Sequence, residues 1–186
     1  MLTSISRLGE RARGHDHTWT VAIYSVASVV GGLTTGLLLG ALGRLLPLGH
    51  RPLWAAAVCA TAVLLDVSGQ VPTIRRQVDE DWLSRYRRWV YATGFGWQLG
   101  TGVSTVITSG AVYAWLGLVA LQRSLGAALL VGAVFGLVRA GPLLLLRADT
   151  PAALRAAAAS IADRSRPAAT VTVVLLAFGS AVLVLT

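Results

Sequence analysis

The sequence predicts an all-α integral membrane protein with five transmembrane helices, built from two parallel two-helix repeats, a C-terminal helix and amphipathic cytoplasmic arms. Three observations lead to this fold class. The 186 residues are 55% hydrophobic and only 13% charged, with a mean hydropathy of +0.68. Long apolar stretches recur along the chain, and the chain matches itself at an offset of 70 residues. Together these features indicate a single membrane domain over residues 1–186.

Five apolar stretches approach the roughly 20 residues that a helix needs to cross about 30 Å of hydrocarbon. The second and fourth reach that length only when they continue through an ionisable residue, Asp66 and Arg139 respectively. No period-2 alternation is present, so helices are favoured over barrel strands. The first stretch is too long and glycine-rich for a signal peptide and is expected to remain as a helix. The stretches are Trp19–Gly43, Leu53–Leu65, Trp89–Leu121, Ser124–Val138 and Ala168–Thr186.

The offset of 70 residues pairs Trp19 with Trp89 and Gly32 with Gly102, and it also pairs Pro72 with Pro142. Residues 3–72 are the first predicted repeat and residues 73–142 the second, followed by an arm and a fifth helix over 143–186. Each repeat holds two helices, an even number, so both copies enter the membrane in the same direction. We therefore expect a pseudo-two-fold axis along the membrane normal.

The charge distribution predicts the orientation of the chain. All 16 basic residues are arginines. On the predicted topology twelve of them fall on one side, three on the other, and Arg139 lies inside. The N-terminus is therefore expected in the cytoplasm and the C-terminus outside, in the inner membrane of a bacterium. A basic cytoplasmic face against anionic lipid accounts for the net charge of +8 without nucleic acid as a partner.

Two cytoplasmic segments between the predicted helices have helical character. Residues 73–88 mix apolar and charged side chains, and residues 150–166 open with a capping threonine followed by proline. Both are predicted to lie on the membrane surface as amphipathic arms. For the second segment, a solvated connector is an equally good interpretation, since its apolar face is mostly alanine.

Two predicted helices carry a distinct polar or small-residue face. In the first, small residues recur every fourth position and predict close approach of another helix. These residues are Ser28, Gly32, Gly36 and Gly40. In the third, four hydroxyls share a face. They either bond to carbonyls one turn back or line a hydrated path that has Gln98 at its cytoplasmic end. The four are Thr101, Ser104, Thr105 and Thr108.

Asp66 and Arg139 lie in the cytoplasmic thirds of corresponding helices, shortly before Pro72 and Pro142. Charges at that depth are costly unless they are paired, hydrated or able to reach the interface. The repeat brings both residues to the same height, so the sequence predicts a polar centre in which they neutralise one another directly, through water or through a solute. Gln70 is expected on the same face as Asp66.

Several chemistries lack the residues they need. Residues 14–18, GHDHT, place two histidines beside an aspartate, but His50 is the only other histidine and is expected across the membrane, so no metal site is predicted. The single cysteine, Cys59, can form no internal disulfide and argues against a thiol relay, which needs two thiols. No catalytic triad, phosphate loop or dinucleotide turn is present. We expect neither enzymatic activity nor a cofactor.

Two functions remain open. The first is a small-solute transporter or channel along a path formed by the polar residues named above. The alternative is a non-catalytic subunit that assembles with a partner protein through its glycine-rich helix face and cytoplasmic arms. A count of five helices is odd for a carrier of two repeats. Under either interpretation a homo-oligomer or a partner membrane protein is expected.

Overall fold

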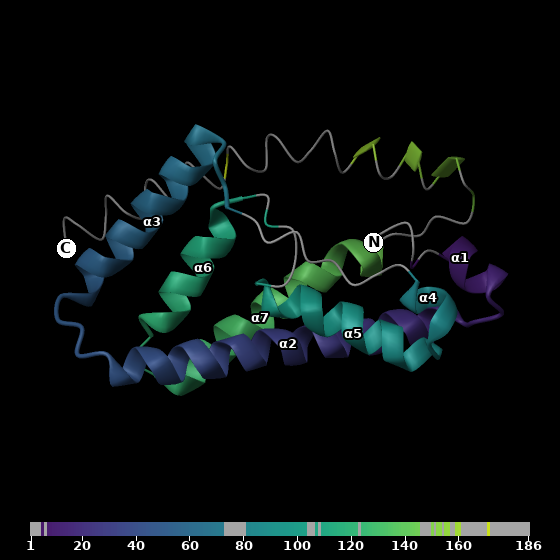
Figure 1. Cartoon of the computed structure of the whole chain (residues 1–186), viewed down its shortest axis with the longest axis horizontal. Coiled ribbons are helices and arrows are strands. Elements are labelled where there is room, and N and C mark those ends of the chain that lie inside the picture. Colours follow the sequence, from purple (N-terminus) through teal and green to yellow (C-terminus); the bar gives the residue numbers. More distant parts are fainter. Residues whose placement is uncertain are drawn as a thin grey trace.

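The computed structural model describes residue 5, residues 7–72, 81–103, 107, 109–122 and 124–145, and residues 150, 152–153, 155–156, 159–160 and 171. This part of the chain is helical and holds no strand. Figure 1 shows the elements in order. They are α1 (Arg7–Ala12), α2 (His17–Leu45), α3 (Arg51–Ser68), α4 (Trp82–Arg85), α5 (Arg88–Thr101), α6 (Ala111–Ala120) and α7 (Leu125–Leu145).

Among the described residues, three helices are long and apolar enough to cross a membrane. They are α2, α3 and the segment Leu125–Leu144 of α7. The prediction of five spans is not confirmed. The third apolar stretch is divided between α5 and α6, and the predicted fifth helix lies outside the described residues except for Val171. Most of the two predicted arms also lies outside them.

The ends of α2 and α3 follow from local sequence. Asp16 caps α2, because its carboxylate accepts a 2.8 Å hydrogen bond from the backbone N–H of Thr18. Proline follows Arg51 in the first turn of α3, where its missing N–H costs nothing. Gly69 ends α3 in a left-handed conformation with φ of 66°. Both α3 and α7 extend through the ionisable residues that the sequence predicts within them.

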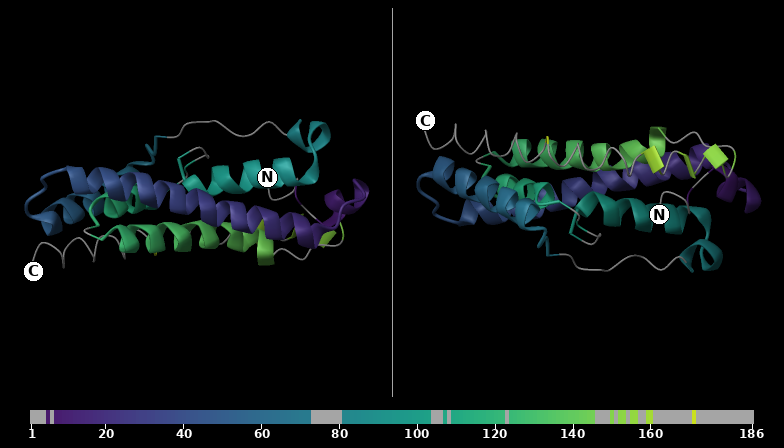
Figure 2. Two further views of the ribbon diagram at one scale, coloured as in Figure 1. Left: turned by 90° about the horizontal axis from the view of Figure 1, so that it is seen from below. Right: turned by 90° about the horizontal axis from the view of Figure 1, so that it is seen from above.

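Helix α2 is the centre of the fold and lies between α5 and α7 (Figure 2). Its small-residue face packs on α7. A side chain at Gly32 would collide with the backbone of Gly132, and one at Gly36 with the backbone of Ala128. At the end of this face the hydroxyl of Ser28 donates a 2.8 Å hydrogen bond to the carbonyl of Gly136. Gly40 also contacts Ala128, so all four predicted packing residues face α7.

The direction of the helices bears on the proposed repeat. Gly96 packs against Tyr24, and Gly100 packs further along α2 against Ser28, so α5 runs parallel to α2. The repeat requires this direction. However, α2 is continuous over 29 residues, whereas its counterpart in the second copy is interrupted after Thr101. The repeat therefore stays a prediction.

At one end of α2 the helices α3 and α6 lie side by side and lean away from the central bundle (Figure 1), while the end of α6 contacts α2 where Ala120 lies against Gly43. Val58 of α3 contacts Gly117 of α6, and Ala62 contacts Gly110 at the start of α6. As the residue numbers rise on one helix they fall on the other, so the two helices are antiparallel.

Candidate functional site

The third apolar stretch is interrupted between Thr101 and Ala111, and this corrects the single helix predicted over Trp89–Leu121. The physical reason lies in the residues of the stretch. Residues 103–108 include five β-branched residues, which are poor helix formers, and glycine stands at 102 and 110. The predicted face of four hydroxyls depended on one continuous helix. Thr101 ends α5, and Ser104, Thr105 and Thr108 lie outside the described residues.

Gly102 forms the first turn of the interruption. Its φ of 71° is left-handed, a conformation that glycine adopts without steric cost. The site is also crowded, because a Cβ at Gly102 would lie 3.1 Å from the rings of both Phe135 and Trp115. Those two rings stack on one another with centroids 3.7 Å apart and an interplanar angle of 9°. An aromatic pair from α6 and α7 therefore closes this end of the interruption.

Asp66 lies at the other end of the interruption. One carboxylate oxygen accepts a 2.6 Å hydrogen bond from the backbone N–H of Gly110, and the other accepts a 3.0 Å bond from the hydroxyl of Ser109. An anion is favourable at the N-terminal end of a helix, where backbone N–H groups lack partners within the helix. Asp66 thus fastens the end of α3 to the beginning of α6.

A cation holds the opposite end of the same helix pair. The guanidinium of Arg51, at the start of α3, donates a 2.8 Å hydrogen bond to the carbonyl of Leu121 just after α6. It also donates a 3.3 Å bond to the carbonyl of Gly43 in α2. The charges of Asp66 and Arg51 therefore complement both ends of the α6 dipole.

The structure does not bring Asp66 and Arg139 together. Asp66 bonds to residues at the start of α6, and no ion pair joins it to Arg139. The guanidinium of Arg139 instead lies over the ring of Phe135, 5.8 Å from its centroid. The physical reason is that α3 packs on α6, whereas Arg139 belongs to α7, which packs on α2. Of the three forms of neutralisation predicted from the sequence, the direct pair is absent, and neutralisation through water or a solute stays a prediction.

The remaining predicted residues are divided between two environments. Gln98 and Thr101 are buried in α5, and the Thr101 hydroxyl donates a 2.8 Å bond to the carbonyl of Gln98. The carbonyl of Thr101 accepts a 3.1 Å bond from the hydroxyl of Thr35 on α2, which fixes the end of α5. Gln70 is exposed just beyond the end of α3, where its backbone N–H donates a 3.4 Å hydrogen bond to the hydroxyl of Ser68.

A buried polar cluster beside the start of α2 was missed by the sequence analysis. The side chain of Glu10 is fully buried, and its carboxylate accepts a 2.6 Å bond from the hydroxyl of Thr20 and a 2.7 Å bond from Arg13. The Tyr91 hydroxyl lies 2.9 and 3.0 Å from its two oxygens, and Nδ1 of His15 lies 3.2 Å from the same hydroxyl. The cluster joins α1, α2 and α5. The available signal was a lone glutamate shortly before the first apolar stretch.

Opposing effects act on the pKa of Glu10. Burial alone would raise the pKa, but the hydrogen bonds from Thr20, Arg13 and Tyr91, together with the positive charge of Arg13, hold it below its usual value of 4.5. The carboxylate is therefore ionised at neutral pH. Its contacts are those of a fixed structural anion that ties three helices together.

The described residues also bear on whether the protein could bind a metal ion. In the part of the chain that the structure describes, no three histidine, cysteine, aspartate or glutamate side chains are grouped so that they could hold a metal ion. Comparisons with protein-family models, with curated proteins and with solved structures find no match. Fold and site therefore define a class only. It is an all-helical protein with three candidate membrane spans and an interrupted helix bordered by charged residues.

Proposed function

We propose that the protein is a non-enzymatic small-solute transporter or channel of the bacterial inner membrane, with its path beside the interruption between α5 and α6. The observation that carries this proposal is the bonding of Asp66 to Ser109 and Gly110 at the interruption. A carboxylate on one candidate span thus meets unwound backbone from another apolar stretch.

The cost of this arrangement in a membrane supports a functional role. Hydrocarbon offers no hydrogen bonds, so backbone that leaves a helix at membrane depth must be buried in protein or line a water-filled cavity. Transporters use interrupted helices of this kind to present backbone groups and helix ends to a solute. An ionisable side chain within a span is likewise a functional candidate by default.

The charges around the interruption also support the proposal. Asp66 stands at its Gly110 end, while Phe135, which contacts Gly102 at the other end, lies under the guanidinium of Arg139. A solute entering between these ends would meet groups of opposite sign that are not paired with one another. In this proposal the predicted polar centre is retained, but Asp66 and Arg139 lie at opposite ends of the interruption.

Flux measurements in proteoliposomes test the proposal. Glycerol, urea, ammonium and acetate serve as probes, with osmotic shrinkage followed by light scattering. We expect at least one probe to cross faster than in protein-free vesicles, and Asp66→Asn to reduce that flux at least tenfold. Asp16→Asn is the matched control, because Asp16 is an exposed helix cap and asparagine caps equally well.

Thermal unfolding of both variants in detergent separates function from folding. Equal flux in Asp66→Asn and the unaltered protein would contradict a path at the interruption. A folded protein that passes none of the probes would favour the non-catalytic membrane subunit, whose assembly with a partner is then the property to measure.

A further inference from the structure

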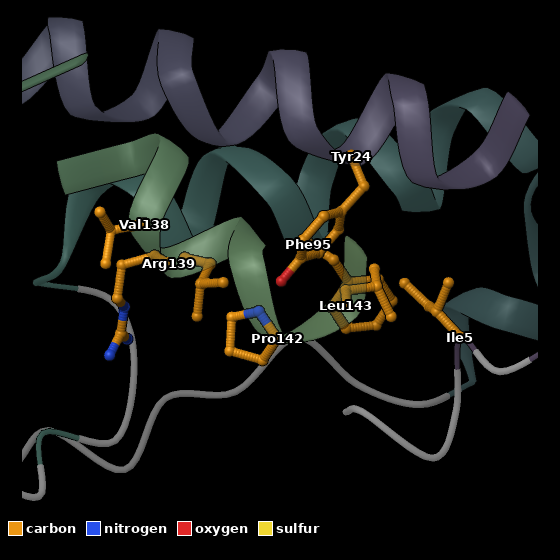
Figure 3. Close-up of a pocket in the computed structure, with 8 residues that line it drawn as sticks. Ile5, Tyr24, Phe95, Val138, Arg139, Pro142 and Leu143 are labelled. Atoms are coloured by element: carbon orange, nitrogen blue, oxygen red, sulfur yellow. The ribbon is translucent and has the colours of Figure 1, made fainter. Parts of the chain in front are cut away.

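A pocket of about 240 Å³ opens among α2, α5 and α7, apart from the bonds that Asp66 makes (Figure 3). Most of its wall is hydrocarbon and comes from residues far apart in the sequence. An apolar cavity of roughly 150 Å³ is already large enough to hold a benzene molecule. The pocket therefore has room for one ring with a small substituent. Its apolar lining residues are Ile5, Phe95, Leu99, Val138, Pro142 and Leu143.

The hydroxyl of Tyr24 faces this pocket. The residue is only 6% exposed, and Figure 3 shows its oxygen directed from α2 toward Pro142 of α7. The hydroxyl makes no hydrogen bond to any residue that the structure describes. Buried tyrosine hydroxyls usually have a partner. A ligand with a hydrogen-bonding group would supply the partner that this hydroxyl lacks.

The charge of Arg139 is not directed at the Tyr24 hydroxyl. Arg139 belongs to the lining, but its guanidinium lies over the ring of Phe135, 5.8 Å from the centroid, and Figure 3 shows it directed away from the Tyr24 oxygen. The described lining holds no acidic side chain. A charged ligand would therefore be buried beside the hydroxyl without a partner of opposite sign, which is costly, whereas a neutral hydroxyl needs only a hydrogen bond.

We propose that this pocket binds a small neutral molecule made of one ring and one hydroxyl, a phenol in the simplest case. The ligand hydroxyl bonds to that of Tyr24, which can both donate and accept. Phe95 favours an aromatic ring in the ligand, because aromatic pairs stabilise one another beyond their buried area. A lipid acyl chain would leave the Tyr24 hydroxyl without a partner. The inference goes beyond the proposed transport function, and binding is measured without any flux, so each can fail without the other.

Equilibrium dialysis of radiolabelled phenol against the full chain tests the proposal, with the same detergent concentration on both sides so that uptake by micelles cancels. We expect saturable binding at neutral pH. Tyr24→Phe removes only the hydroxyl, so it is expected to weaken phenol binding about fivefold, the scale of one hydrogen bond between neutral groups. Unchanged toluene binding in the same variant shows that the pocket is intact. Benzoate is expected to bind the unaltered protein roughly tenfold more weakly than phenol, because its charge finds no partner beside Tyr24.

Tyr113→Phe is the matched control, because the Tyr113 hydroxyl bonds to the carbonyl of Pro72 and does not line the pocket. It is expected to bind phenol normally. Non-saturable binding, benzoate binding as tight as that of phenol, or an unchanged phenol affinity in a folded Tyr24→Phe variant would overturn the proposal. Phenol binding that is lost when the protein moves from detergent into phosphatidylcholine nanodiscs would also overturn it, by assigning the pocket to an acyl chain.

Discussion

Glu10 illustrates how single residues are stabilised in this fold. A fully buried carboxylate is costly, but here Thr20, Arg13 and Tyr91 all bond to it. Because three helices contribute to the cluster, the charge links parts of the chain that are far apart. Removing the charge leaves these donors without an anion.

We predict that Glu10→Gln lowers the free energy of unfolding by about 2 kcal/mol, the scale of hydrogen bonds to a charged group. The change is measured by thermal or chemical unfolding in detergent at neutral pH. Asp16→Asn, an exposed cap substitution, is expected to change stability by less than about 0.5 kcal/mol. Equal stability of Glu10→Gln and the unaltered protein would show that the cluster contributes nothing.

The same residue predicts a pH dependence. The pKa of Glu10 is lower in the folded protein than its usual value of 4.5. The folded state therefore binds this proton more weakly than the unfolded state, and the stabilisation is complete above about pH 4.5 and lost as pH falls below it. We expect the unfolding temperature of the unaltered protein to fall more steeply below pH 4.5 than that of Glu10→Gln. Parallel curves would contradict the assignment.

At this scale the sequence indicated which residues are unusual but not their partners. Asp66 and Arg139 stand out because each is a charge in an apolar stretch. Their partners, Ser109 and Gly110 for one and Phe135 for the other, depend on which helices pack together. The burial of Glu10 is not predictable from the sequence, because it lies outside the apolar stretches, where an exposed glutamate is the common case.

At the scale of elements, α3 and α6 form a pair whose contacts the sequence did not predict. The signals for the interruption before α6 were present in Gly102, Gly110 and the β-branched residues between them. Residues 89–121 contain no charged residue, and this continuous apolar character favoured one long helix over the signals for a break. The small-residue face of α2 was easier to interpret, since spacing of four in a helix places residues on one side whatever the neighbour is.

We predict that a disulfide forms between Val58→Cys and Gly117→Cys in a Cys59→Ala background. The Cβ of Val58 and a Cβ built at position 117 are 3.4 Å apart, close to the separation in natural disulfides. Oxidation in membranes, followed by cleavage of the chain between residues 72 and 81 and gel electrophoresis, detects the bond. Val58→Cys with Leu116→Cys is the control, because residue 116 is turned about 100° away around α6. Equal cross-linking of both pairs would contradict the packing of α3 on α6.

At the scale of the whole molecule, three helices are long and apolar enough to cross a membrane, and α2 is the longest of them. Parallel α2 and α5 fit the direction that two repeats require. The helix predicted as the counterpart of α2 is interrupted after Thr101. A match of the sequence with itself therefore does not by itself establish two equal structural halves. Glycines that match in sequence can have different roles. Gly32 belongs to a helix packing face, whereas Gly102 ends a helix in a left-handed conformation.

The orientation predicted from the arginines applies to the whole chain. His50 follows one end of α2, and Arg85 belongs to α4 near the other end of the bundle. We predict that His50→Cys reacts with an impermeant thiol reagent from outside the cell, and that Arg85→Cys reacts only after permeabilisation, both in a Cys59→Ala background. Labelling of residue 85 from outside would reverse the topology.

Water access at the interruption between α5 and α6 tests the central claim most directly. Single cysteines at Val103, Ile107 and Ser109 are introduced without Cys59 and treated in membranes with a small charged thiol reagent. The account predicts labelling at Ser109, beside Asp66, and at one or both of the other positions. It predicts no labelling of Leu38→Cys or Leu130→Cys, which are exposed on the apolar surfaces of α2 and α7. Absence of labelling at all three positions, with both lipid-facing controls also unlabelled, would show a dry segment and contradict a solute path there.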